Sequence, residues 1–191
     1  MNYKGLFHRV ISLLSTPGKA WDDIKVENAG NRVLMEFAYP LIGLCGLSEF
    51  IGTVFKGTTG ASILFQEAMT RCCAVAVSLF GGLFLSAYVL NMLNRKWTKT
   101  NISYERMLAF SCYTMVVIFV LNIVRGLFPE SIVLHLILQL YTVVIAFEGI
   151  RRWLNMKAES QTAFTVVATI TLLVCPAVIE FVFNKLSMIL N

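Results

Sequence analysis

The sequence predicts an all-α polytopic membrane protein: a bundle of five transmembrane helices with an amphipathic N-terminal helix at the membrane interface. Of the 191 residues, 57% are hydrophobic and 14% are charged, whereas about 25% of the residues of a soluble domain are charged. The apolar residues form continuous runs rather than alternating ones, which favours helices over barrel strands. The charged residues lie mostly in short connectors between these runs.

Five apolar runs have the length of a transmembrane helix, which needs about 20 mainly apolar residues. Residues 1–32 are expected to form a cytosolic interfacial segment, and residues 33–191 the membrane domain. The predicted spans cover residues 33–55, 74–93, 107–124, 132–150 and 164–183.

The distribution of Lys and Arg predicts the orientation, because cytosolic connectors carry an excess of basic residues. The N-terminal segment and the second-to-third and fourth-to-fifth connectors together hold twelve of the sixteen. The other four are Lys56, Arg71, Arg125 and Lys185. This split predicts a cytosolic N-terminus and an outside C-terminus, and it requires an odd number of spans.

The N-terminal segment predicts an amphipathic helix on the cytosolic membrane surface, because its first residues place apolar side chains at helical spacing with Lys4, His8 and Arg9 between them. Thr16 followed by Pro17 predicts a second helix that starts at Pro17. Two interpretations are open: a docking surface for a protein partner or lipid, or an interfacial anchor that packs on its own bundle. The candidate docking residues are Leu14, Pro17, Ala20, Trp21 and Ile24.

Three features resemble a known family. Residues 13–24, LLSTPGKAWDDI, look like its "leucine–small–Pro–x–x–Ala–Trp" motif, and residues 102–110, ISYERMLAF, look like its aromatic and basic lead into the third span. The third feature is the five-span plan with a cytosolic N-terminus. The sequence thus resembles the Yip family of Ypt/Rab-interacting membrane proteins. The resemblance implies a prokaryotic-type member in the cell (inner or plasma) membrane, with a scaffold or adaptor role in membrane organisation or trafficking.

Charged residues at bilayer depth are costly and mark functional sites by default. Glu49 and Glu180 each lie sixteen residues after the start of an outward-running span, about 24 Å from the cytosolic edge at about 1.5 Å per residue. Arg125 ends the third span on that side, and His135 and Gln139 begin the fourth. These five side chains are predicted to share an outer polar layer. Two interpretations are open: ion pairs that hold the bundle together, or a proton or cation site.

Two other polar groups in the spans have local explanations. The carbonyl of Glu36 loses its helical donor because Pro40, four residues later, has no N–H. Glu148 lies three and four residues before Arg151 and Arg152, which predicts an ion pair on one helix face. The glycines and prolines of the spans fit close helix packing or, alternatively, the broken helices of transporters.

The sequence contains no phosphate-binding loop, nucleophile motif or metal-ligand spacing. We therefore expect no enzyme, no catalytic residue, no metal site and no cofactor. Since the basic residues lie beside apolar runs, the expected partner is the lipid bilayer rather than nucleic acid. A protein partner at the N-terminal segment and a homo-oligomer remain open. The predicted function is a non-enzymatic scaffold or adaptor, and the alternative is a small transporter or channel subunit that uses the outer polar layer.

Overall fold

The computed structural model describes residues 3–27, 32–57, 60–97, 102–128, 137–156 and 158–190. Every regular element in these ranges is a helix, which confirms the all-α class. The elements are α1 (Tyr3–Ser15), α2 (Pro17–Glu27), η1 (Leu34–Ala38), α3 (Tyr39–Lys56), α4 (Ala61–Trp97), α5 (Tyr104–Thr114), α6 (Val116–Leu127), α8 (Thr142–Arg152) and α9 (Ala158–Leu190).

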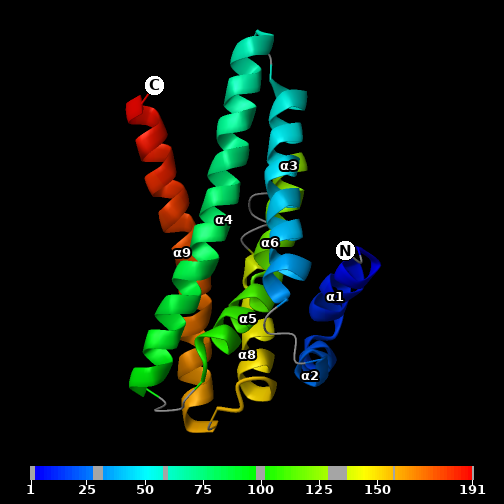
Figure 1. The fold of residues 1–191 in the computed structure, drawn as a ribbon, viewed down its shortest axis with the longest axis vertical. Helices are drawn as coiled ribbons and strands as arrows, with labels where there is room; N and C mark the ends of the chain where they lie inside the picture. The colour runs from blue at the N-terminus through cyan, green and yellow to red at the C-terminus, as the bar shows by residue number, and fades with distance from the viewer. Residues whose placement is uncertain are drawn as a thin grey trace.

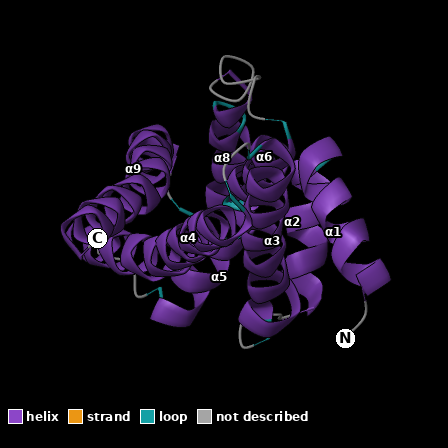
Figure 2. Cartoon of the chain, turned by 90° about the horizontal axis from the view of Figure 1, so that it is seen from above, coloured by secondary structure: helices purple, strands orange, loops and turns teal. Residues whose placement is uncertain are grey.

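The helices α3, α4 and α9 run along the long axis of the molecule, and α1 and α2 lie against its flank (Figure 1). Seen from above, α4 lies between α3 and α9, and it packs on both (Figure 2). The α6 helix packs on α3, and α2 packs on α8. The N-terminal helices are therefore attached to the bundle on the side away from α9.

Four helical stretches of the described chain are long and apolar enough to cross a bilayer. They are Leu34–Lys56, Ala61–Lys96, Tyr104–Leu127 and Ala158–Ile189. They coincide with the first, second, third and fifth predicted spans. Large apolar side chains remain exposed on their outer surfaces, including Phe80, Tyr88, Ile170 and Phe181. Faces of this kind suit contact with lipid rather than with water.

The predicted fourth span, 132–150, differs from the other four. Its residues 132–136 lie outside the described part of the chain. The rest forms a helical turn at 137–139, a turn at 140–141 and the start of α8. At 11 residues, α8 is about half the length that a span needs. A single helix over this region is therefore not what the described residues form.

The helix α4 begins earlier than predicted, at Ala61 instead of residue 74, and has 37 residues. At about 1.5 Å per residue it is about 55 Å long, which exceeds the hydrocarbon thickness of about 30 Å. Its first turns carry Glu67 and Arg71, which pair with each other one turn apart. The pairing lets the helix continue through residues that we assigned to a connector.

The wide turn η1 is a π-helical turn directly before Pro40, in which the Tyr39 N–H donates to the Leu34 carbonyl. Its place agrees with the predicted loss of a donor for the Glu36 carbonyl, because a proline interrupts the α-helical ladder there. The first span is thus η1 followed by α3 rather than one regular helix.

Small residues allow the helices to approach closely. A Cβ atom added to Gly52 on α3 would lie 1.8 Å from the carbonyl oxygen of Gly126 on α6. A Cβ added to Gly82 on α4 would lie 2.6 Å from the Cα of Pro176 on α9. These contacts support the packing interpretation of the glycines and prolines, because only a missing side chain leaves room for the neighbouring backbone.

The core of the molecule includes the N-terminal hairpin of α1 and α2. The Trp21 side chain is fully buried, and its Nε1 donates to the Ile145 carbonyl at 3.0 Å. Its ring stacks on Phe110, with the centroids 5.8 Å apart. Gly149 makes room for the indole, because a Cβ there would lie 2.6 Å from Cζ2 of Trp21. The hairpin is therefore joined to the bundle by core packing.

Candidate functional site

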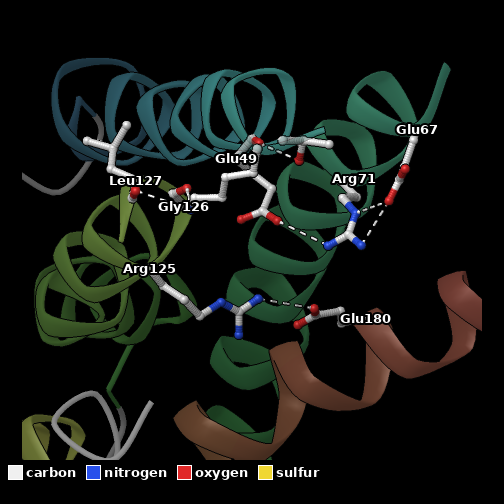
Figure 3. A network of polar contacts seen from close by, with 9 residues as sticks. Glu49, Glu67, Arg71, Arg125, Gly126, Leu127 and Glu180 are labelled. Carbon is white, nitrogen blue, oxygen red and sulfur yellow. Dashed lines mark hydrogen bonds and ion pairs between the residues drawn. The ribbon is translucent and has the colours of Figure 1, made fainter. Parts of the chain in front are cut away.

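Charged side chains from four helices meet near the C-terminal end of α3 (Figure 3). Glu49 comes from α3, Glu67 and Arg71 from α4, Arg125 from α6 and Glu180 from α9. Arg71 Nη2 lies 3.0 Å from Glu67 Oε1, and Arg71 Nη1 lies 3.8 Å from Glu49 Oε1. Arg125 Nη2 lies 3.6 Å from Glu180 Oε1. Each ion pair except the one within α4 joins two helices.

These five side chains line a cleft of about 640 Å³, which we call the outer cleft. Ligand pockets have volumes of about 300–1,000 Å³, so it is large enough for a small molecule or a lipid headgroup. The other polar side chains of its lining are Gln66, Thr70 and Asn184, and the apolar ones are Ile63, Ala74 and Val75. A smaller cleft of about 240 Å³ shares four of the five charged residues.

Two of the ion pairs in the outer cleft are loose. A hydrogen bond between a guanidinium and a carboxylate is about 2.7–2.9 Å long, whereas Glu49–Arg71 and Arg125–Glu180 measure 3.8 and 3.6 Å. Glu49 is also the most enclosed of these charged groups, with 16% of its side chain exposed. The partners in these two pairs are therefore not joined by short hydrogen bonds, and a third group can bind to them.

The positions of Glu49 and Arg125 follow from the crossing of α3 and α6. The Gly52–Gly126 contact brings the two backbones together one turn after Glu49 and one residue after Arg125. Lys56 Nζ donates to the Leu127 carbonyl at 3.2 Å. A cation is favourable there because the last carbonyls of a helix carry partial negative charge. The glycine contact and the lysine thus fix the carboxylate and the guanidinium on one side of the cleft.

Three of the residues predicted for the outer polar layer come together, namely Glu49, Arg125 and Glu180. Gln139 is half-buried and is not among the residues that line the outer cleft. His135 lies outside the described residues.

Glu67 and Arg71 belong to the cleft but were not predicted for it. Their spacing of four residues beside an apolar helical pattern, with Leu64 and Ala68, was the signal that could have placed them on a helix.

The candidate docking residues mostly face inward. Ala20, Trp21 and Ile24 are buried in the core, and Leu14 and Pro17 are half-buried. The three buried side chains have no surface for a partner, so their burial fits the interpretation that the segment packs on its own bundle. The helix α2 begins at Pro17, as the sequence predicts.

Arg152 ties the hairpin to α8 at the opposite end of the molecule from the outer cleft. Its Nε lies 2.6 Å from Glu148 Oε2, which confirms the predicted pairing with Arg152. Its Nη1 lies 2.5 Å from Asp22 Oδ2 on α2. The hydrogen bond that the Arg152 guanidinium donates to the Glu148 carboxylate, together with the charge of Asp22, raises the pKa of the guanidinium. This closed arrangement contrasts with the loose pairs of the outer cleft.

A groove of about 400 Å³ lies between α1 and α2. His8 and Arg9 line it from α1, and Asp23 and Val26 line it from α2. The Arg9 guanidinium also lies over the ring of Tyr113, 5.8 Å from its centroid. We call this the hairpin groove.

In the described part of the chain, no three His, Cys, Asp or Glu side chains are grouped so that they could hold a metal ion. The charged and polar side chains that line the outer cleft offer ion pairing and hydrogen bonding.

The Yip1 domain matches residues 11–179 of the chain. The chain belongs to the Yip1 domain family. This confirms the resemblance in the sequence and makes the chain an integral membrane protein of the Yip family. The Yip1 match starts inside α1 and ends one residue before Glu180, so it includes most of the hairpin and four of the five charged cleft residues. No curated protein and no solved structure matches the chain.

Proposed function

We propose that this Yip1-domain protein is a non-enzymatic scaffold or adaptor in membrane organisation. It crosses a prokaryotic cell membrane five times, with the N-terminus in the cytosol and the C-terminus outside. The observation that carries the proposal is the hairpin of α1 and α2. Trp21 and Arg152 join it to the bundle, yet it keeps an exposed apolar stripe and the polar hairpin groove.

The apolar stripe suits the cytosolic leaflet of the bilayer. Tyr3, Phe7 and Ile11 follow one another at one-turn spacing, and they are 68%, 68% and 49% exposed. Val10 and Leu13, on the neighbouring face of the same helix, are buried against the bundle. An amphipathic helix with one face on its own protein and one apolar stripe left open is stabilised when lipid covers the stripe.

Five crossings are supported by where the two ends of the fourth region lie. Leu127 is near the C-terminal end of α3, where Lys56 contacts its carbonyl. Trp153 is at the other end of the bundle, where its Nε1 donates to the Arg106 carbonyl at 3.5 Å. A chain that joins these two ends passes along the bundle once more, which supports an odd number of passages. An odd number agrees with the twelve-to-four division of basic residues.

The hairpin groove is the surface that we assign to a cytosolic protein partner. It has His8 and Arg9 on one wall and Asp23 on the other. Such a groove complements a protein segment that carries both an acidic and a basic side chain, because each charge then faces its opposite. The partner surface is thus beside, rather than on, the buried Trp21.

Site-specific photocrosslinking in the full-length protein tests both surfaces. A benzoylphenylalanine in place of Phe7 is expected to form adducts with phospholipid. The same group in place of His8 is expected to form an adduct with a protein. That adduct should disappear in the Asp23→Arg variant and persist in Glu159→Arg, a matched charge reversal at an exposed position of α9. Lipid adducts at both positions, with no protein adduct that depends on Asp23, would contradict the adaptor role.

The outer cleft favours a second candidate, a small transporter or channel subunit. Its support is that Glu49, Arg125 and Glu180 line one cleft and come from three stretches that are long and apolar enough to cross a bilayer. A solute has to bind in this cleft before it can be carried across, so occupancy of the cleft is the first requirement for transport.

A further inference from the structure

We propose that the outer cleft binds a group that joins a primary ammonium to a phosphate, which is the chemistry of an ethanolamine phospholipid headgroup. The inference is independent of the adaptor role, because the cleft and the hairpin lie at opposite ends of the bundle. It concerns binding and holds whether or not the ligand then crosses the membrane.

The charge of the outer cleft selects the class of ligand. Three carboxylates and two guanidiniums line it, so one negative charge is left over when they pair. A ligand that is only anionic would add to that excess, a cation would reduce it, and a zwitterion would leave the net charge unchanged while it pairs with both signs. The presence of both guanidiniums favours the zwitterion, since each sign of charge on the ligand then meets its opposite.

Each of the two facing walls of the outer cleft carries both signs of charge. Arg125 and Glu180 lie on one side of the opening, and Glu49, Arg71 and Glu67 lie on the other (Figure 3). Because the Arg125–Glu180 pair is 3.6 Å long, the planar guanidinium can turn its fork of donors to two phosphate oxygens. An ammonium group has three N–H donors and can bridge Glu49 and Glu180.

In the proposed topology, on which this step rests, the depth of the outer cleft suits a headgroup of the outer leaflet. By helix rise, Glu49 lies about 24 Å from the cytosolic start of its span, and the hydrocarbon is about 30 Å thick. A headgroup thus has to descend only a few ångströms to reach it. The C-terminal end of α9 stands apart from α4 (Figure 1). Exposed apolar side chains lie on the same two helices as the cleft residues. They are Ile63 on α4, which lines the cleft, and Phe181 and Leu186 on α9, and acyl chains can lie along them.

Related headgroups lack one of the two required features. A choline headgroup has a quaternary ammonium without N–H donors, so it cannot donate to the carboxylates of Glu49 and Glu180. A glycerol headgroup has the phosphate but no cation. The outer cleft should therefore prefer ethanolamine lipids over both, and the preference should depend on Glu49, the most enclosed carboxylate of the cleft.

Native mass spectrometry of the full-length protein in detergent tests this preference. Ethanolamine, choline and glycerol phospholipids with identical acyl chains are added at equal concentration, and the retained lipid is counted. We expect about tenfold more retention of the ethanolamine lipid, since one hydrogen bond to a charged group changes affinity by about that factor. Glu49→Gln should remove the preference. Glu105→Gln, the same change at an exposed position of α5, should keep it. Equal retention of the three lipids by the unmodified protein would overturn the proposal.

A measurement on the unmodified protein covers the case in which Glu49→Gln does not fold. A photoactivatable ethanolamine phospholipid should form adducts within residues 61–75 and 178–186, and adducts confined to other segments would overturn the proposal. Soluble phosphoethanolamine distinguishes the sources of the headgroup. If it displaces the lipid at equal concentration, the ligand is a free solute of the same chemistry, and if it does not, the ligand is the lipid.

Discussion

At the scale of single residues, the contact between Gly52 and Gly126 determines how α3 and α6 meet. A Cβ on Gly126 would lie 2.8 Å from the Glu49 nitrogen, so neither helix has room for a side chain at the crossing. The same contact holds Glu49 and Arg125 beside the outer cleft. Replacement of either glycine should therefore change both the stability and the cleft.

Gly52→Ala is expected to lower the thermal unfolding midpoint of the protein in detergent. The added methyl group would lie 1.8 Å from the Gly126 carbonyl oxygen, so the helices must separate, at a cost of about 1–3 kcal/mol or more. Gly43→Ala is the matched control in the same helix, because nothing lies within 4 Å of a Cβ there. Its midpoint should stay or rise, since Ala favours a helix by about 0.5–1 kcal/mol over Gly. Equal midpoints for the two variants would refute this account.

At the scale of elements, the hairpin of α1 and α2 is tied to α8 at two points. The Trp21 indole occupies the space that a side chain at Gly149 would fill. Arg152 forms ion pairs with both Asp22 and Glu148. The first tie is apolar and enclosed, whereas the second is ionic and half exposed. The ionic tie should therefore govern how often α2 opens without unfolding the bundle.

Arg152→Met is expected to speed the cleavage of α2 by trypsin after Lys19 and Lys25, which are exposed. The variant removes both ion pairs of Arg152 but keeps an unbranched side chain. Arg151→Met is the control, because Arg151 is exposed and makes neither of these contacts. Cleavage rates measured by mass spectrometry should rise only in Arg152→Met, and a rise of the same size in both variants would argue against the tie.

The sequence predicted those helices and contacts that depend on local hydropathy and charge. Four spans, the break at Pro17 and the pairing of Glu148 with Arg152 follow from local patterns, and the structure confirms them. The start of α4 was missed because hydropathy does not register that Glu67 and Arg71 neutralise each other within a helix. The turn after residue 139 was missed because the length of an apolar run can be read from the sequence, whereas the position at which the helix within it breaks cannot.

The candidate site was predictable only in part. Counting residues along two spans placed Glu49 and Glu180 at one depth, and the structure brings both to the outer cleft. Burial of Trp21 could not be derived in this way, because an interfacial helix and a packed helix have the same apolar face. Which of the two occurs depends on Gly149, which is distant in sequence and makes room for the indole.

At the scale of the whole molecule, the two ends of the bundle differ in their polar chemistry. At the end with Arg152, the nitrogen and oxygen atoms of both ion pairs are close together. At the end with Glu49, the Glu49–Arg71 and Arg125–Glu180 pairs are longer and leave the cleft open. In the proposed topology of five crossings with a cytosolic N-terminus, the end with Glu49 faces the outside of the cell and the end with Arg152 faces the cytosol. The direction of the protein in the membrane therefore decides which solution reaches the outer cleft.

Labelling of lysines with a membrane-impermeant reagent tests this direction without any substitution. In intact cells, Lys56 and Lys185 should be modified, and Lys19 and Lys25 should be protected until the membrane is permeabilised. All four are exposed on the protein itself, so protection must come from the bilayer. Peptide mapping by mass spectrometry reads the result. Modification of Lys25 in intact cells, or protection of Lys185 together with Lys19, would exclude five crossings in this direction.

The wide turn at Leu34–Ala38 has an effect far from where it lies. A π-helical turn holds one residue more than an α-helical turn, which rotates everything after it by about 100° around the helix axis. Without that rotation, Gly52 would point away from Gly126 and Glu49 would point out of the outer cleft. The π-helical turn before Pro40, at one end of the first span, thus sets the direction in which the Glu49 carboxylate points near the other end.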